Sequence, residues 1–523
     1  MNRFLISLIS VLLLFPSIAL SNPTSRDSFK WDGTKITKFI GKETNVVIPD
    51  GTTEIGEDAF YYKSVKSVVI PEGVTRIGEK AFLNCGSLTS ITIPDSVRVI
   101  ENGAFSYCSS LKEWKISPTQ PYFKSVGPAL LTKEGKKLIA CHTAEGEYRI
   151  PDGVTEIGFD AFTNSKSLTS VAIPDSVREI GEFAFGHCPA LKTWSISSSH
   201  PFFKSVGPAL LTKDGKKFIA CPSAAGDYRI PDGVTEIENH AFLYCESLTS
   251  VTLPDSVTSI GEEAFFLCKS LTSVTLPDGV KKIGASAFVN CPLTSIVIPK
   301  GVTAIEECLF DSCGFLESVV IPDSVTVIRD SAFRGCNALT TISIPQSVTE
   351  IEGWAFSYCD SLTTIKIPKG VTEIQEMTFA GCPSLKSVVL PDGLMVIGYG
   401  AFDECSSLSS ITIPQGVTKI GDWAFHCCPL KSFVIPEGVT KIGEGTFCGC
   451  DSLESIIIPE NVKEIGDCAF QDCESLKSVV IPESVEKIGI SAFDDCPNLT
   501  IHAPKGSEAE KYAKENNISF QAK

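Results

Sequence analysis

Histidine and cysteine side chains are the groups in this sequence that could act as bases, nucleophiles or metal ligands. The six histidines are scattered, and none stands beside a repeated Ser or Asp. The sequence contains no Gly-rich phosphate loop, no H-E-x-x-H and no G-x-S-x-G. An enzyme site needs several acids or bases gathered on one face. We therefore expect no catalytic residue, no metal ligand and no cofactor.

The 21 cysteines follow a regular spacing. Stacked identical positions would point their Cβ atoms in parallel, which suits the torsion of a disulfide poorly. We predict a buried ladder of small side chains and expect any disulfide to involve Cys427, Cys448 or Cys468. Fifteen of the 21 lie 14 residues after a repeated Pro: Cys85, Cys108, Cys188, Cys245, Cys268, Cys291, Cys313, Cys336, Cys359, Cys382, Cys405, Cys428, Cys450, Cys473 and Cys496.

The spacing of the cysteines belongs to a longer repeat that fills most of the chain. One copy, residues 230–254, contains I-P-D-G-V-T-E-I, then A-F, then C, then L-T-S-V-T-L-P, and the period is 22 or 23 residues. We count 17 units that begin between Pro49 and Pro482. Such a period predicts a solenoid, in which each L-T-S-V-T-L segment is a strand of a parallel sheet. Pro ends the strand because it has no N–H for the ladder.

Alternation along each strand sends Val and Leu into the core and leaves Ser, Thr and some β-branched residues outside. The outward positions hold almost no carboxylates, Glu113 being one. This face could bind a broad protein surface, although the same residues are also simply good strand formers. Its candidate binding residues are Ser410, Thr412, Ser432, Val434, Ser455, Ile457, Ser478 and Val480.

Two near-identical insertions, about residues 117–150 and 197–230, interrupt the repeat. In each, an apolar run, a Gly-containing turn and a second apolar run predict a β-hairpin. Trp114 and Trp194 precede the hairpins, and we expect them in the core. Each hairpin adds lysines and aromatic residues to an acidic protein; it is either a binding element or a cover for its own strand edges. The candidates are Tyr122, Lys124, Lys133, Lys136, Phe202, Lys204, Lys213 and Lys216.

The chain divides into four predicted parts. Residues 1–21 have the apolar run and small residues of a secretory signal peptide. Residues 22–48 form an N-terminal cap with a strand at 31–41, and residues 49–504 form the solenoid. Residues 505–523 form a C-terminal cap, with a helix that Ser507 begins and a last short strand. The net charge of −17 argues against nucleic acid and anionic membranes as partners.

The unit I-P-x-[GS]-V-x-x-I-G-x-x-A-F-x-x-C-x-S-L-x-S-V-x-I-P resembles the BspA-like, or Treponema-type, leucine-rich repeat family. The likeness extends to the hairpin insertions and the terminal S-E-A-E-K-Y-A-K helix. It implies a curved, β-rich solenoid of the α/β repeat type, with a concave parallel sheet, that is secreted or held at a cell surface. It also implies adhesion to host matrix proteins, other cells or immune components.

We therefore expect a non-catalytic adhesin whose partner is an extracellular protein, such as a matrix or host-surface protein. No wall-anchor motif, spanning helix or lipidated Cys is evident, which leaves free secretion and non-covalent association open. Two other functions stay open. One is a structural or self-assembling surface-layer protein, and the other, less favoured, is a polysaccharide-active enzyme.

Overall fold

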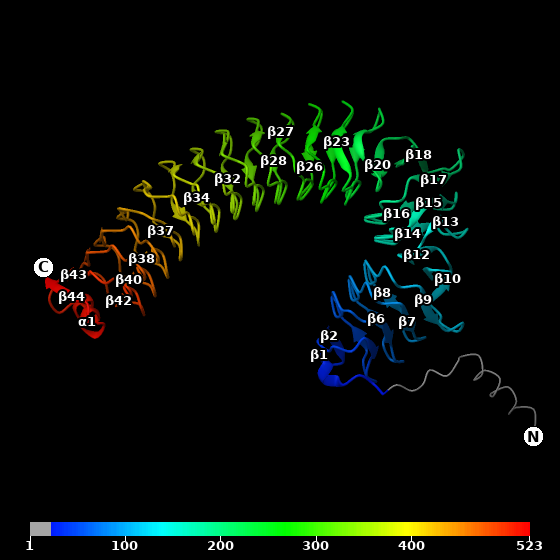
Figure 1. Cartoon of the computed structure of the whole chain (residues 1–523), viewed down its shortest axis with the longest axis horizontal. Helices are drawn as coiled ribbons and strands as arrows, with labels where there is room; N and C mark the ends of the chain where they lie inside the picture. The colour runs from blue at the N-terminus through cyan, green and yellow to red at the C-terminus, as the bar shows by residue number, and fades with distance from the viewer. Residues whose placement is uncertain (1–21) are drawn as a thin grey trace, which may run out of the picture. The chain divides into compact units, whose positions relative to one another are not determined.

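The computed structural model describes residues 22–523, and the predicted signal peptide at 1–21 lies outside them. The chain forms two compact units, Met1–Phe202 and Phe203–Lys523. Both are solenoids built almost entirely of short strands, and successive repeats stack side by side within each unit (Figure 1). The predicted β-rich repeat solenoid is confirmed.

The predicted parallel strands form one side of each repeat, which we call the serine ladder. Ser250, Val251 and Thr252 pair in register with Ser273, Val274 and Thr275 of the next repeat. Val251 is buried, whereas Thr252 is exposed, as the alternation predicts. The strands of this ladder are β3 (Asn45–Val47), β5 (Ser67–Val69), β7 (Ser90–Ile93), β9 (Glu113–Ile116), β13 (Gly146–Arg149), β15 (Leu168–Ile173) and β17 (Thr193–Ile196) in the first unit. In the second unit they are β21 (Gly226–Arg229), β23 (Leu248–Thr252), β25 (Ser273–Thr275), β27 (Ser295–Val297), β29 (Ser318–Val320), β31 (Thr341–Ile342), β33 (Thr364–Lys366), β35 (Ser387–Val389), β39 (Ser455–Ile457), β41 (Ser478–Val480), β43 (Thr500–Ala503) and β44 (Ser519–Ala522).

The serine ladder is interrupted at residues 410–413 and 432–435, which form no strand although we expected strands there. The repeat that begins at Pro414 is one residue short, with Pro429 directly between Cys428 and Leu430. Its inward strand position holds Phe433, whose ring packs 5.0 Å from Phe425 and 4.8 Å from Phe447. The same shortened Cys-Pro-Leu loop at residues 291–293 is followed by strand β27 (Ser295–Val297), so the bulky Phe433 ring is the feature that distinguishes the interrupted repeat.

A second parallel ladder, which the sequence did not reveal, runs along another side of each repeat. We call it the isoleucine ladder, because most of its strands are two residues long and end in Ile, as in the pairing of Glu236 and Ile237 with Ser259 and Ile260. Its strands in the first unit are β2 (Lys35–Phe39), β4 (Glu54–Ile55), β6 (Arg76–Ile77), β8 (Val99–Ile100), β12 (Lys137–Ala140), β14 (Glu156–Ile157) and β16 (Glu179–Ile180). In the second unit they are β20 (Lys217–Ala220), β22 (Glu236–Ile237), β24 (Ser259–Ile260), β26 (Lys282–Ile283), β28 (Ala304–Ile305), β30 (Val327–Ile328), β32 (Glu350–Ile351), β34 (Glu373–Ile374), β36 (Val396–Ile397), β37 (Lys419–Ile420), β38 (Lys441–Ile442), β40 (Glu464–Ile465) and β42 (Lys487–Ile488).

A Gly follows the Ile in 11 of the 17 isoleucine-ladder strands that end in Ile, and it permits a close approach of the repeats at this corner. A Cβ on Gly78 would lie 2.8 Å from the backbone nitrogen of Glu57 in the preceding repeat. Real Cβ atoms do not come so near to backbone, so the close approach at Gly78 requires glycine.

Turns that carry the Ala-Phe pair close the third side of the repeat. The Phe rings stack through the core, for example Phe265 on Phe288 with centroids 5.4 Å apart and planes 3° apart. Backbone N–H groups here donate to the next repeat, as Phe265 does to the carbonyl of Ala287 at 2.9 Å. The predicted cysteine ladder lies beneath. Cys268 is buried, and its thiol donates to the carbonyl of Phe242 at 3.1 Å.

Each insertion contains the predicted hairpin and one further strand. In the first, β10 (Phe123–Val126) pairs with β11 (Ala129–Thr132), which pairs with β12, and β12 then joins the isoleucine ladder beside β14. The second has β18 (Phe203–Val206), β19 (Ala209–Thr212) and β20 in the same arrangement. Trp114 is buried as expected, and its Nε1–H donates to the carbonyl of Pro128 at 2.9 Å. The insertion therefore forms one turn of the stacked solenoid and is not a loop that projects from it.

The ends of the array are covered by different devices. At the start, the 3-10 turn η1 (Arg26–Ser28) leads into an antiparallel pair, β1 (Phe29–Asp32) with β2, where we expected one strand. At the end, helix α1 (Glu508–Glu515) begins at Ser507, whose hydroxyl accepts from the N–H of Glu510. Ala509, Tyr512 and Ala513 are buried against the last repeat, which confirms the predicted capping helix.

Candidate binding surfaces

The edge strands of the two insertions expose an aromatic and an aliphatic side chain. Strand β10 lies at the edge of its sheet, and Phe123 points into the core while Tyr122 and Val126 remain 40% and 45% exposed. Phe202 and Val206 repeat this pattern at 40% and 44%. Of each predicted aromatic pair, therefore, one ring is available to a partner and the other belongs to the core.

The lysines of the first insertion divide into bound and free side chains. Lys133 Nζ donates to the carbonyl of Pro118 at 3.1 Å, and Lys137 forms an ion pair with Glu156. The Lys124 side chain lies across the turn at Gly135. Its Nζ is 2.7 Å from the position that a Cβ would occupy if Gly135 had one. Lys136 is exposed and has no ion pair within residues 22–523. A lysine on an edge strand, such as Lys124, also discourages pairing with another strand.

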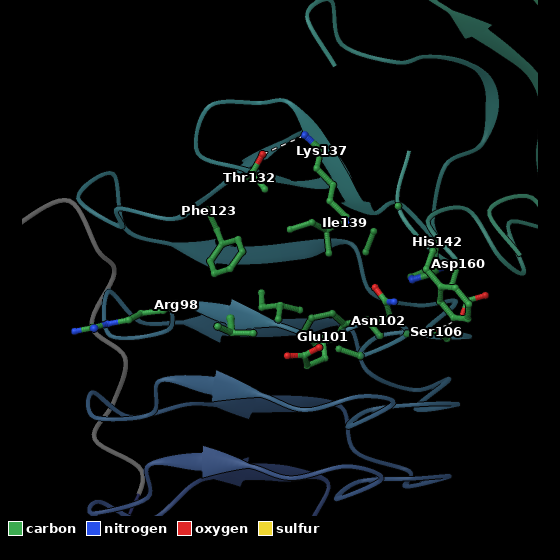
Figure 2. Close-up of a pocket in the computed structure, with 18 residues that line it drawn as sticks. Arg98, Glu101, Asn102, Ser106, Phe123, Thr132, Lys137, Ile139, His142 and Asp160 are labelled. Carbon is green, nitrogen blue, oxygen red and sulfur yellow. Dashed lines mark hydrogen bonds between the residues drawn. The ribbon is translucent and has the colours of Figure 1, made fainter. Parts of the chain in front are cut away.

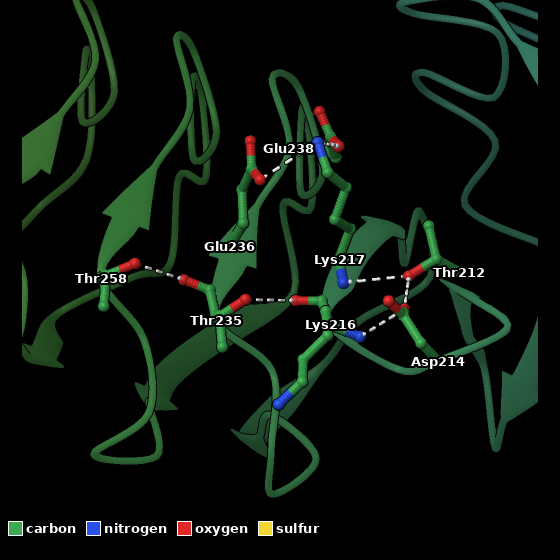
Figure 3. Close-up of polar contacts among 8 residues, drawn as sticks. All are labelled: Thr212, Asp214, Lys216, Lys217, Thr235, Glu236, Glu238 and Thr258. Atoms are coloured by element: carbon green, nitrogen blue, oxygen red, sulfur yellow. Dashed lines mark hydrogen bonds and ion pairs between the residues drawn. The ribbon is translucent and has the colours of Figure 1, made fainter.

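The second insertion has the same arrangement around a more ordered turn (Figure 3). Asp214 accepts hydrogen bonds from the Thr212 hydroxyl at 2.6 Å and from the Lys216 N–H at 2.9 Å, and these bonds lower the pKa of Asp214. Lys217 Nζ lies 3.1 Å from Glu236 and 2.9 Å from Glu238.

The other lysines of this insertion resemble their counterparts in the first. Lys204 crosses the turn at Gly215, and Lys213 is exposed. Lys216 is exposed and, in the described part of the chain, forms no ion pair through its side chain.

The eight candidates on the serine ladder do not form one uniform surface. Val434 and Ile457 are 71% and 70% exposed, and Ser432 and Ser455 are exposed in the same two repeats. Ser410 and Thr412 are exposed as well, but they lie in the interrupted part of the ladder.

The last pair of candidates is less accessible. Ser478 and Val480 lie on β41, which pairs with β43, and both side chains are half-buried. Val480 is opposite His502 in this pairing. A second exposed pair, Val297 and Val320 at 63% and 57%, lies in register on β27 and β29. We had not included these two residues among the candidates.

Outward side chains of the isoleucine ladder are charged and largely satisfy one another. Arg329 contacts Glu306 at 3.0 Å and Glu352 at 3.2 Å, and Glu464 lies between Lys441 and Lys487. The acidic excess of the chain is thus partly neutralised along this side. The serine ladder carries fewer charges, among them Glu113, Lys115 and Lys366, and most of its outward side chains are Ser, Thr or aliphatic.

A cavity of about 220 Å³ lies in the first unit, between β8 and β12, where the isoleucine ladder is broken (Figure 2). Asp160 is 7% exposed and accepts from the hydroxyls of Ser106 and Thr163. Burial raises the pKa of Asp160 to about 6. We had not singled out this pocket, because the residues that line it come from several repeats.

His142 lines the same cavity. Its Nδ1 lies 3.1 Å from the carbonyl of Thr163, and burial lowers the pKa of His142 to about 4. The imidazole is therefore neutral at pH 7, with Nδ1–H as the donor. We had counted His142 among the scattered histidines. The second insertion has Pro222 at the matching position, so this pocket is a difference between the two copies.

The repeat, with its Leu-spaced strand, Ala-Phe turn and buried Cys, is now defined in three dimensions. A family model described as "BspA type Leucine rich repeat region (6 copies)" matches residues 38–127, 141–208, 218–317, 303–398 and 372–500. The chain belongs to the BspA-type leucine-rich repeat family.

Three of the solved structures that are similar to this chain are bacterial leucine-rich repeat proteins. A leucine rich cell surface protein of Faecalibacterium prausnitzii A2-165 is 32% identical over 62% of this chain and 99% of its own, with a TM-score of 0.39. A leucine-rich repeat protein of Bacteroides ovatus is 25% identical over 96% and 97%, with a TM-score of 0.30. The leucine-rich repeat protein of T. pallidum is 30% identical over 40% and 90%, with a TM-score of 0.29. Among curated proteins the comparison found no match.

Residues 22–523 of this BspA-type array lack two kinds of functional element. No helix there has the length and apolar character to cross a bilayer. No group of three or more His, Cys, Asp and Glu residues there is placed to hold a metal ion. The residues that repeat in this BspA-type chain are committed to core, ladders and turns, so its candidate binding residues are the exceptions to the repeat.

Proposed function

We propose that this BspA-type protein is a non-catalytic adhesin, secreted or carried at the cell surface, that binds an extracellular matrix or host-surface protein. The observation that carries the proposal is the sparsely charged serine ladder with its exposed aliphatic side chains, above all Val434 and Ile457. Solvent-exposed aliphatic side chains side by side on an otherwise polar face mark an interaction surface. The description of the F. prausnitzii relative as a cell surface protein agrees with this location.

The hairpins supply a second point of contact of a different kind. Lys136 and Lys216 are exposed cations on an acidic protein, and Tyr122 and Phe202 are exposed rings in the same two insertions. Aromatic residues give a large contact area at low entropic cost, and free lysines favour an acidic patch on the partner. A partner that contacts both surfaces would gain from avidity.

Binding of the mature chain to a panel of immobilised extracellular-matrix proteins tests the proposal. We expect the double variant Val434→Lys with Ile457→Lys to weaken binding at least tenfold, because it places two charges in the apolar contact. The matched control is Thr252→Lys with Thr275→Lys, which adds the same charges at the same strand positions of β23 and β25. Equal loss in both variants would assign the effect to charge, not to the apolar pair.

The hairpin contribution is measured with Lys136→Glu combined with Lys216→Glu. Lys505→Glu with Lys514→Glu in the C-terminal cap changes the net charge equally and serves as its control. We expect the hairpin variant to weaken binding several-fold at low salt and less at high salt. If neither the ladder variant nor the hairpin variant changes binding to any of the matrix proteins, the proposal is contradicted.

A further inference from the structure

Two thiols, an imidazole and a carboxylate meet on the turn side of three successive repeats. Asp403, His426 and Cys448 each directly follow the core Phe of their repeat, Phe402, Phe425 and Phe447, so they stack at equivalent positions. His426 Nδ1 lies 2.6 Å from Asp403 Oδ1, and His426 Nε2 lies 3.3 Å from the sulfur of Cys427. The ring of Trp423 packs edge-on against His426 at 5.1 Å. The imidazole is thereby fixed with one nitrogen on a carboxylate and the other on a thiol.

The carboxylate keeps this imidazole charged. The hydrogen bond with Asp403, followed by one with Cys448, raises the pKa of His426 to about 10. At neutral pH the Nδ1–H therefore donates to Asp403 and the Nε2–H donates to the sulfur of Cys427. Burial and the negative charges around Cys427, those of Asp403 and Glu404 among them, raise the pKa of the Cys427 thiol. His426 is the neighbour that favours the thiolate.

The two thiols differ in access and lie on adjacent repeats whose backbones are hydrogen-bonded at this point. Cys427 is exposed, and its sulfur sits over Gly449, where a Cβ would come within 2.9 Å of it. Cys448 is buried, with 7% of its surface exposed. The N–H of Cys427 donates to the carbonyl of Cys448 at 2.8 Å, which holds the two Cα atoms within about 7 Å of each other. Disulfides form across such separations after rotation of the side chains.

We propose that Cys427 is a thiol–disulfide exchange site that reacts with a low-molecular-weight disulfide, and that Cys448 is its resolving thiol. Cys308 and Cys468 also sit in left-handed turn positions, with φ of 52° each, but no imidazole is hydrogen-bonded to either sulfur in the described chain. They are therefore internal controls for the effect of His426.

The exchange takes two steps in which atoms and electrons balance. Cys427 loses its proton to water, and its thiolate attacks one sulfur of R–S–S–R. The S–S bond breaks, a Cys427–S–S–R mixed disulfide forms, and the leaving RS⁻ takes a proton from water. The Cys448 thiol then loses its proton and attacks the sulfur of Cys427, releasing a second RSH. Two protein thiols are oxidised to one disulfide, and R–S–S–R is reduced to two RSH.

Glutathione disulfide is the probe for the test. The reduced, folded, mature chain is mixed with it at pH 8, free thiols are blocked at intervals, and each cysteine is followed by peptide mass spectrometry. We expect a peptide pair joined through Cys427 and Cys448, formed at least about ten times faster than Cys308 or Cys468 is modified. Modification of Cys427 at the rate of Cys468 would overturn the proposal.

Three variants separate the roles. Cys448→Ser should stop at the mixed disulfide, with one glutathionyl group on Cys427. His426→Gln should slow the first step at least about fivefold, and Asp403→Asn should slow it less, with unchanged circular dichroism. Asp403→Asn leaves the ring in place, so it remains informative where His426→Gln disturbs packing. An unchanged rate in both His426→Gln and Asp403→Asn, or no mixed disulfide in Cys448→Ser, would refute the assignment.

Discussion

Asp160 and His142 share Thr163 as a hydrogen-bond partner, yet acid acts on them in opposite senses. The pKa of His142 is lowered to about 4, so the unfolded chain takes up its proton first and stability falls as the pH drops from 6.5 toward 4. The pKa of Asp160 is raised to about 6, so the folded chain takes up its proton first and stability rises as the pH drops through 6. Over the same pH range the two effects nearly cancel.

The variant Asp160→Asn should expose the contribution of His142. Each shift corresponds to about 3 kcal/mol at most, so we expect the variant to lose up to about 3 kcal/mol more than the parent between pH 6.5 and 4. Urea denaturation followed by tryptophan fluorescence measures this difference. The double variant with His142→Gln should return the pH dependence to that of the parent. If the free energy of unfolding changes with pH in the same way for the parent and for Asp160→Asn, the two groups do not titrate as inferred.

At the scale of the element, the corner where an isoleucine-ladder strand is followed by Gly is a close contact between repeats. We expect Gly78→Ala to lower the free energy of unfolding by about 1–3 kcal/mol, because its Cβ would press on the backbone of Glu57. Gly86→Ala is the matched control, since the nearest atom to a Cβ there is Ser109 Oγ at 3.9 Å. Thermal unfolding of the two variants compares them directly. Equal melting temperatures would contradict the claim that a Cβ at Gly78 destabilises the fold.

Elements with a strong local signal could be predicted from the sequence. The alternation around Val251 defined the serine ladder, and Ser507 marked the start of α1. The isoleucine ladder could not be found this way, because a two-residue strand such as Glu236–Ile237 is too short to show alternation. Its pairing comes only from the stacking of repeats.

Candidate residues were predicted by type and register, but not by accessibility. Ile457 and Val480 occupy the same outward position in adjacent strands, yet Ile457 is 70% exposed while Val480 is half-buried. Packing near the C-terminal cap reduces the exposure of Val480. Such packing depends on the tertiary structure and not on the local sequence. The Cys427 cluster was likewise visible only as three irregular cysteines until the repeats were stacked.

At the scale of the whole molecule, the charge and the strand edges bear on self-association. The chain carries a net charge of −17, and the final strand β44 exposes Ser519 and Gln521. Like charge opposes contact between copies, and a short polar edge is a poor template for pairing. We expect the mature chain to remain monomeric in light scattering up to high concentration at physiological salt. A mass that grows with concentration would instead favour the surface-layer alternative.

The interrupted serine ladder has a mechanical consequence. Repeats are joined by hydrogen bonds between neighbours, so tension along the stacking direction loads one interface after another, and the interface with the fewest bonds yields first. Residues 432–435 lack strand pairing with the next repeat, which makes that interface the weak link of the second unit. Cys427 and Cys448 face each other across it. A disulfide there would covalently link the two repeats at the place where the array under tension would otherwise begin to open.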